Sequence, residues 1–184
     1  MAKIEQKQVI VNEIKEKLER DGFAVAGSVF SEEKMGPLPQ AILDEVFSFA
    51  DVVLVEADGS KRMPLKMPRQ GEPVLLETCD FLVTVAGLSA LGQPWEQVCH
   101  RFALVSSMFS GKTVAEGDIF PLLQAGYGTL WDEIQGCVFL NQAEVVGWDR
   151  AEKIAADFSV PCLWGSLRQK QYHRKEGDSH ERSI

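Results

Sequence analysis

The feature that most constrains the fold is an alternation of short apolar runs with segments of helical period. Uninterrupted apolar strands separated by helices are typical of a parallel sheet with helices on both faces. The chain is therefore predicted to be an α/β protein with a mainly parallel sheet, in which ligands gather at the carboxyl ends of the strands. Strands are predicted over 23–27, 51–58, 81–86, 136–142 and 160–166, and helices over 1–21, 39–50, 117–124 and 149–158.

Length and composition favour one globular domain. The 184 residues are 45% hydrophobic and 25% charged, enough for one core, which we place at 1–167, followed by a polar and mobile tail at 168–184. A formal net charge of −8 argues against general binding to nucleic acid or to an anionic membrane. The charged start is not a signal peptide, and no apolar run approaches the roughly 20 residues of a membrane span.

The four cysteines are far apart in the sequence and lie beside apolar residues. They form no C-x-x-C pair, and neither they nor the three histidines have the spacing of zinc ligands. We interpret them as reduced core cysteines of a cytoplasmic protein. They are Cys79, Cys99, Cys137 and Cys162.

The stretch "DVVLVEADGSKRMPLK", residues 51–66, is the first candidate site. Glu56 and Asp58 follow the apolar run directly, so they are predicted at the carboxyl end of a buried strand, where ligands gather in α/β sheets. Carboxylates at such a strand end commonly hold Mg²⁺, directly or through water. The alternative is a loop of solvated charges with a local Lys–Asp pair.

A basic loop follows these acids. Gly59 lets the backbone approach a ligand, and Ser60 follows it. Lys61, Arg62 and Lys66 are predicted to form a positive rim that binds phosphate or another anion, stiffened by two prolines.

Three further motifs carry weaker signals. "FSGKT" at 109–113 lacks the first glycine of a phosphate loop, since Ser106 stands there, so we interpret it as an ordinary loop. "NQAE" begins at Asn141 after a strand, where guanine-binding hydrolases carry N-K-x-D; an Asx-type turn is the alternative. His100 and Arg101 form a His–Arg pair. Glu72 precedes Pro73, and we interpret it as an ordinary loop residue.

Several pieces occur in one order that resembles a known family. They are "VLVEADGSKRMPLKMP", "GEPVL", "VTVAGLSALGQP", "HR", "FLNQAE" and "GSL". Together they resemble the selenium-dependent hydroxylase accessory protein family, the YqeC type, over roughly residues 9–168. The resemblance implies a P-loop hydrolase-like fold, a role in maturation of selenium-dependent molybdenum hydroxylases, and Mg²⁺ with ATP or GTP as cofactors. It places Glu56, Asp58, Gly59, Ser60, Lys61 and Lys66 in the family signature, and His100, Arg101 and Asn141 at further motif positions.

Members of that family open with a strand and a G-x-G-G-K-T-type loop, whereas this sequence opens with a helix. The resemblance then leads us to expect no nucleotide hydrolysis by the isolated chain. It also leads us to expect an open edge beside residues 51–58, covered by a second copy or by a partner that supplies the loop.

Three functions remain open at this point. The first is an accessory protein for hydroxylase maturation, with maturation factors as partners. The second is an active Mg²⁺-dependent nucleotide hydrolase that uses an unusual loop near Gly111, Lys112 and Thr113. The third is a non-catalytic protein-binding module that presents a sheet edge and the loop at 59–68. Magnesium-dependent nucleotide binding by the isolated chain separates the second function from the other two.

Overall fold

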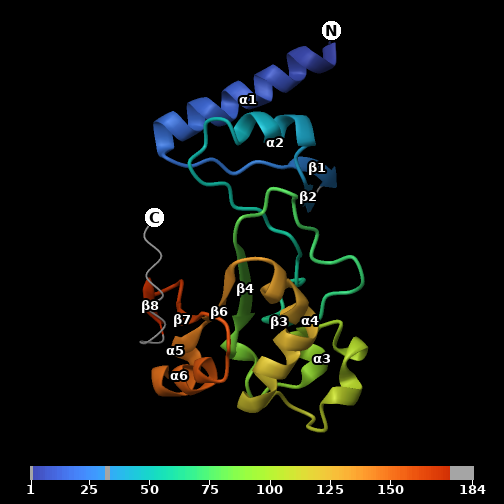
Figure 1. Ribbon diagram of the computed structural model, residues 1–184, viewed down its shortest axis with the longest axis vertical. Coiled ribbons are helices and arrows are strands. Elements are labelled where there is room, and N and C mark those ends of the chain that lie inside the picture. The colour runs from blue at the N-terminus through green and yellow to red at the C-terminus, as the bar shows by residue number, and fades with distance from the viewer. Residues whose placement is uncertain (1, 32–33, 175–184) are drawn as a thin grey trace. The chain divides into compact units, whose positions relative to one another are not determined.

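The computed structural model describes residues 2–31 and 34–174. The chain divides into two compact units, Met1–Val55 and Glu56–Ile184, where the sequence analysis placed one domain over 1–167. Both units contain helices and short strands, so the chain is a mixed α/β protein (Figure 1). We describe each unit by itself.

The first unit pairs two helices with a β-hairpin. Helix α1 (Ala2–Asp21) ends where Gly22 takes a left-handed φ of +78°, as the glycine in the sequence predicted. Helix α2 (Gln40–Val46) lies within the predicted range 39–50, and strands β1 (Ser28–Ser31) and β2 (Lys34–Gly36) pair antiparallel. The predicted strand at 23–27 is wrong, because the extended pairing begins only at Ser28. A small core joins the helices, formed by Val11, Ile14, Ile42 and Val46.

The second unit is built on a four-stranded sheet in the order β4-β6-β7-β8. Strands β4 (Leu82–Gly87), β6 (Gly136–Asn141) and β7 (Cys162–Ser166) run parallel, as their apolar sequences predicted. Strand β8 (Gln171–Arg174) adds antiparallel to β7, so part of the predicted mobile tail is ordered, and 175–184 lie outside the described residues. A separate two-residue ladder joins β3 (Leu65–Lys66) to β5 (Cys99–His100) in parallel.

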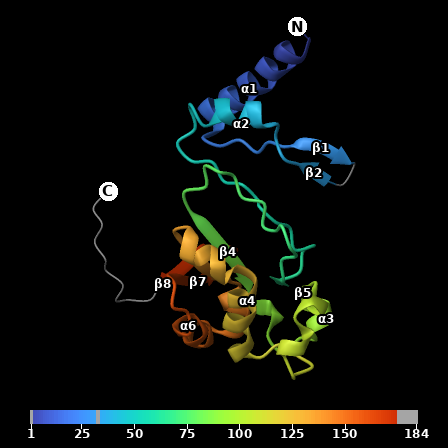
Figure 2. The ribbon, with the colours of Figure 1, turned by 45° about the vertical axis from the view of Figure 1, so that its right-hand side comes forward.

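Helices connect the strands of this unit. The longer ones are α4 (Ile119–Glu133) and α6 (Trp148–Ala156), and the shorter ones are α3 (Trp95–Val98) and α5 (Ala143–Val146). Helix α4 packs along the sheet near β4 (Figure 2). Short 3₁₀ turns occupy Leu88–Ala90, Phe102–Leu104, Ser106–Met108 and Glu116–Asp118.

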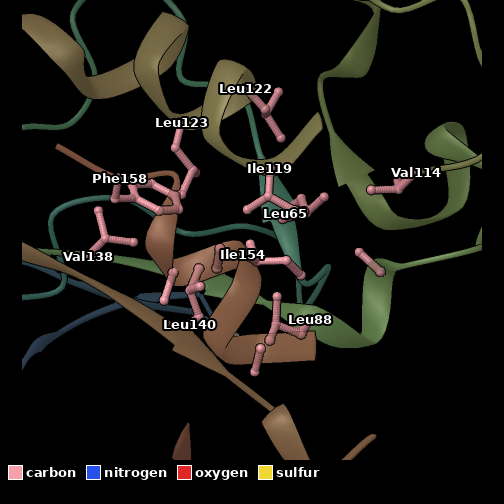
Figure 3. Packing of buried hydrophobic residues seen from close by; sticks show 14 of the residues in the cluster. Leu65, Leu88, Val114, Ile119, Leu122, Leu123, Val138, Leu140, Ile154 and Phe158 are labelled. Atoms are coloured by element: carbon pink, nitrogen blue, oxygen red, sulfur yellow. The ribbon is translucent and has the colours of Figure 1, made fainter. Parts of the chain in front are cut away.

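The core of the second unit lies on one face of this sheet. Val138 and Leu140 of β6 point at Leu123 of α4 and Ile154 of α6, and all four are at most 2% exposed (Figure 3). The opposite face carries Val83 and Val85, which are 49% and 56% exposed. Within the described part of this unit, helices therefore cover one face, and the prediction of helices on both faces is wrong for it. A continuous apolar strand has two apolar faces, but its sequence does not determine whether helices cover both of them.

Residues 51–58 do not form the predicted strand. They are neither helical nor part of a ladder, although Ala57 O accepts from Val74 N at 3.2 Å, and Val52, Leu54 and Val55 are 74%, 91% and 49% exposed. A strand exists only as part of a ladder, and no neighbouring strand among the described residues supplies one for this segment. The apolar run reflects β-propensity, but the prediction of a buried strand at 51–58 is wrong.

Candidate functional site

A buried lysine is at the centre of the polar cluster that we consider the candidate site. Lys66 is the last residue of β3, and its side chain is only 5% exposed. Its Nζ lies 3.0 Å from Asp58 Oδ2 and 2.8 Å from Glu72 Oε2. An ammonium group tolerates such burial only when it is paired and hydrogen-bonded. The two carboxylates meet that requirement.

Glu72 joins the lysine to two arginines. Arg101 donates to both carboxylate oxygens of Glu72, with Nη2 at 3.0 Å from Oε1, and Arg69 Nε lies 3.0 Å from the same Oε1. The forked pairing with Arg101 and the hydrogen bond from Lys66 lower the pKa of Glu72 to about 2. Glu72 is therefore ionised throughout the physiological pH range.

Short backbone ladders hold these side chains in place. Lys66 pairs with His100 in the β3–β5 register, and Met67 N donates to His100 O at 2.9 Å. Arg101 follows with a left-handed φ of 64°, which turns the chain at the end of β5. A non-glycine residue in this conformation is uncommon and often marks a functional segment.

The loop before Lys66 contains two more such residues. Lys61 and Arg62 have φ of 54° and 64°, and Met63 N donates to Ser60 O at 3.1 Å, which together describe a type I′ turn. Ser60 Oγ also donates to Met63 O at 2.7 Å. Both basic side chains are exposed. Glycine and asparagine usually fill such a turn, so the use of two cations there fits a role for their charge.

Helix α4 contributes a tyrosine to the cluster. Tyr127 Oη donates to Asp58 Oδ2 at 3.2 Å. Burial, and then the neighbouring Asp58 charge, raise the pKa of Tyr127 well above its ordinary value, so its hydroxyl stays a donor. Burial also lowers the pKa of His100, and the nearby charges of Arg101 and Lys61 lower it further.

The summed charge of the cluster is positive. Asp58 and Glu72 are outnumbered by Lys66, Arg69 and Arg101, and Lys61 is close enough to act on His100. Arg69 is 68% exposed and can reach a ligand, whereas Lys66 is enclosed. Chemically, this arrangement suits an anion that meets the exposed cations, while Lys66 holds the two carboxylates in position.

A second polar group lies at the carboxyl ends of β4 and β6. Asn141 Oδ1 accepts from Gln142 N at 2.8 Å and from Leu167 N at 3.2 Å. These donors are the next residue and the residue after β7, and not the amide two residues on that defines the Asx-type turn offered as the alternative. Gln142 has a left-handed φ of 66°, and its Oε1 accepts from Ser89 Oγ at 2.7 Å. No hydrogen bond or ion pair among the described residues links the Asn141 side chain to the cluster around Lys66.

Comparison with known proteins places the chain in a family. The model of the YqeC protein family matches residues 2–103. The chain belongs to the YqeC family. It is also similar to "Uncharacterized protein YqeC" of Escherichia coli (strain K12), with 33% identity over 91 residues, 47% of this chain and 36% of that protein. The match thus spans about a third of the length of that curated relative, and no solved structure matches the chain.

The match to the YqeC family covers most of the site. Asp58, Lys66, Glu72 and Arg101 lie inside the matched range, whereas Tyr127 lies beyond it. Of the residues predicted from the sequence, the structure brings together Asp58, Lys61, Lys66, His100 and Arg101. Ser60 and Arg62 lie in the turn at 60–63, where Ser60 bonds Met63. The Lys–Asp pair offered as the alternative at 51–66 is present, but it is buried rather than solvated.

Other predicted site residues lie apart from this cluster. Glu56 is exposed, and a Cβ added at Gly59 would lie 3.6 Å from Glu56 Oε1. Asp58 already accepts from Lys66 and Tyr127, and no group of three metal-ligating side chains occurs in the described residues. The residues present do not form a dedicated Mg²⁺ site, and Mg²⁺ binding stays a prediction.

The loop at 109–113 does not have the form of a phosphate loop. It follows a 3₁₀ turn rather than a strand, no helix begins directly after it, and Thr113 forms a bridge with Pro94. The interpretation of "FSGKT" as an ordinary loop is therefore confirmed.

No helix among the described residues is long and apolar enough to cross a membrane.

Two central residues were missed by the sequence analysis. Glu72 was interpreted as an ordinary loop residue, although the "GEPVL" piece of the family resemblance contained it. Tyr127 gave no signal, because a tyrosine on the apolar stripe of a helix is usually a core residue. Only the fold brings both to Asp58 and Lys66.

Proposed function

We propose that this chain is an accessory protein for maturation of selenium-dependent molybdenum hydroxylases, and that its polar cluster binds a phosphate-type anion. The observation that carries the anion site is the enclosed Lys66 with its two carboxylates, surrounded by exposed cations. Membership of the YqeC family supports the maturation role. A P-loop hydrolase-like ancestry is part of the same proposal, and it is supported by the three parallel strands of the larger sheet.

Each residue has a distinct part in the proposed anion site. Lys61, Arg62 and Arg69 supply exposed positive charge, and Arg101 extends it toward the interior. Lys66, Asp58 and Glu72 are positioning residues that orient Arg101 and the loop. Free phosphate, ATP and GTP share the phosphate chemistry that this arrangement suits.

Magnesium would enter this site with the ligand rather than before it. Mg²⁺ keeps several waters and relies on phosphate oxygens, and Asp58 is already engaged by Lys66 and Tyr127. We therefore derive no hydrolytic step. Binding without turnover by this chain is the expected behaviour.

Titration calorimetry with inorganic phosphate, ATP and GTP, each with and without Mg²⁺, tests the anion site. The double variant Lys61→Ala/Arg62→Ala should weaken binding at least several-fold without loss of folding, because both side chains are exposed. Lys153→Ala on α6, which removes an exposed cation elsewhere, should leave binding unchanged. Equal affinity for all three proteins would contradict the proposed site.

The maturation role requires a separate measurement. Cells that lack the gene and contain a selenium-dependent molybdenum hydroxylase should lose that hydroxylase activity, and the wild-type gene should restore it. Lys61→Ala/Arg62→Ala should restore it poorly, and Lys153→Ala fully. Normal hydroxylase activity in the absence of the gene would contradict the role, whatever the calorimetry shows.

A further inference from the structure

Glu72 already holds cations to which an anionic ligand would bind. Its Oε2 lies 2.8 Å from Lys66 Nζ, and its Oε1 lies 3.0 Å from both Arg69 Nε and Arg101 Nη2. Within the described part of the chain, three cations therefore converge on one negative charge. Arginine binds a carboxylate and a phosphate through the same pair of parallel hydrogen bonds. Glu72 thus occupies the place of an anion in the cluster.

The three cations differ in how far a ligand from solvent can reach them. The side chains of Arg69 and Arg101 are 68% and 25% exposed, whereas that of Lys66 is 5% exposed. A ligand can therefore contact the two arginines, while Lys66 stays enclosed beside Asp58. When both arginines turn to a ligand, Glu72 retains Lys66 as its partner, so its partly buried charge stays paired. The arginines can thus change partners without leaving a buried carboxylate unpaired.

The backbone keeps Glu72 beside these arginines. Glu72 N donates to Arg69 O at 3.0 Å, which closes a tight turn, and Val74 N donates to Ala57 O at 3.2 Å directly after it. The Glu72 carboxylate is therefore tethered at a high effective concentration next to Arg69 and Arg101. Because the turn is fastened by backbone bonds, rotation of side chains is enough to exchange Glu72 for another anion.

We propose that Glu72 is an internal competitor of the ligand, which holds Arg69 and Arg101 against singly charged anions and yields them to a phosphate group. This role of Glu72 rests on the proposed anion site. A free carboxylate such as acetate would replace a tethered group of the same charge, and it would lose its freedom of motion in doing so. A phosphate group carries about 1.5 to 2 negative charges near pH 7 and three acceptor oxygens, so it attracts both arginines more strongly than Glu72 does.

The competing charge of Glu72 is present at every physiological pH. Its pairing with Arg101, and then with Lys66, lowers the pKa of Glu72 to about 2. Only molecules in which Glu72 has released Arg69 and Arg101 can bind an anion through both arginines, and the apparent affinity is reduced in proportion to that fraction. Removal of the Glu72 charge should therefore strengthen phosphate binding, and the expected gain is roughly tenfold.

Titration calorimetry of the full chain with inorganic phosphate tests the competition. Glu72→Gln keeps the shape of the side chain and removes its charge, so it should bind phosphate roughly tenfold more tightly than the wild type. Glu72→Asp retains the charge but withdraws the carboxylate by one C–C bond, roughly 1.5 Å, so its affinity should lie between those of the wild type and Glu72→Gln. Glu116→Gln is the control: it removes the partner of Arg150 in an exposed ion pair, changes the net charge equally, and should leave the affinity unchanged.

Two calorimetric results would overturn the role of Glu72. One is binding by Glu72→Gln that is no tighter than wild type, and the other is wild-type affinity in Glu72→Asp, which is what a simple field effect of the charge predicts. Side-chain NMR of the wild type is independent of how well the variants fold: phosphate should shift the guanidinium signals of Arg69 and Arg101 and leave that of Arg150 in place. An unmoved Arg101 signal at saturation would also overturn it. If neither the wild type nor any variant binds phosphate, the anion site itself is wrong, and the role of Glu72 falls with it.

Discussion

Replacing Lys66 with methionine is the most informative test of the ion-paired cluster. Methionine retains the aliphatic stem of the lysine and removes the charge, so packing changes little. Among the described residues, the change leaves Asp58 with Tyr127 as its hydrogen-bond partner and leaves Glu72 with Arg69 and Arg101. Removing one member of a fully buried ion pair costs about 3–5 kcal/mol. The side chains of Asp58 and Glu72 are 17% and 14% exposed, so we expect about 2–3 kcal/mol here.

The assay is urea unfolding followed by tryptophan fluorescence, with the free energy of unfolding extrapolated to water. Asp58→Asn in the Lys66→Met background should restore part of the loss, because the unpaired buried charge is then gone. The double variant should therefore be more stable than the sum of the single effects by about 1–2 kcal/mol. Lys17→Met provides the control, since Lys17 pairs with Asp21 on an exposed helix surface and should cost at most about 0.5 kcal/mol.

Two results would refute this reasoning. A Lys66→Met protein within about 0.5 kcal/mol of wild type would mean that solvent already screens the pair. Strict additivity of Lys66→Met and Asp58→Asn would mean that the two side chains do not interact in solution, despite the 3.0 Å between Nζ and Oδ2.

Three further predictions concern pH and packing. The pKa of Glu72 falls on folding from 4.5 to about 2. Its contribution to stability is therefore present above pH 4.5 and is lost as the pH falls toward 2. In Glu72→Gln the melting temperature should fall less steeply over that pH range. Gly87→Ala should destabilise by about 1–3 kcal/mol, because an added Cβ would lie 2.7 Å from Pro64 Cβ, and thermal unfolding measures this loss. Trp95→Phe should cost less in urea unfolding than Trp131→Phe, because the buried Trp95 Nε1 has no partner in the described residues, whereas Trp131 Nε1 donates at 3.0 Å to a hydroxyl on β4.

The sequence alone was enough to predict the elements whose cause is local. Helix α1 ends at a glycine, α6 has a clear helical period, and β4, β6 and β7 are apolar and rich in β-formers. The basic loop at 61–66 and the His–Arg pair also stood out, because unusual residues gather there in a short stretch. Local propensity and periodicity depend only on neighbours in the chain, and the predictions of α1, α6, β4, β6 and β7 therefore held, while the role of the basic loop and of the His–Arg pair stays a prediction.

Only the tertiary structure could decide which groups meet. Residues 51–58 have the composition of a strand, but a strand requires a ladder partner, and the described residues provide none. Tyr127 and Arg101 are distant in sequence from the residues they contact, Asp58 and Glu72, and Glu72 reaches Lys66 only because the chain turns back after β3. The Lys–Asp pair that was the alternative interpretation of 51–66 is present, but it is buried rather than solvated. Ladder pairing and the burial of charge depend on contacts between distant residues, which no local pattern records.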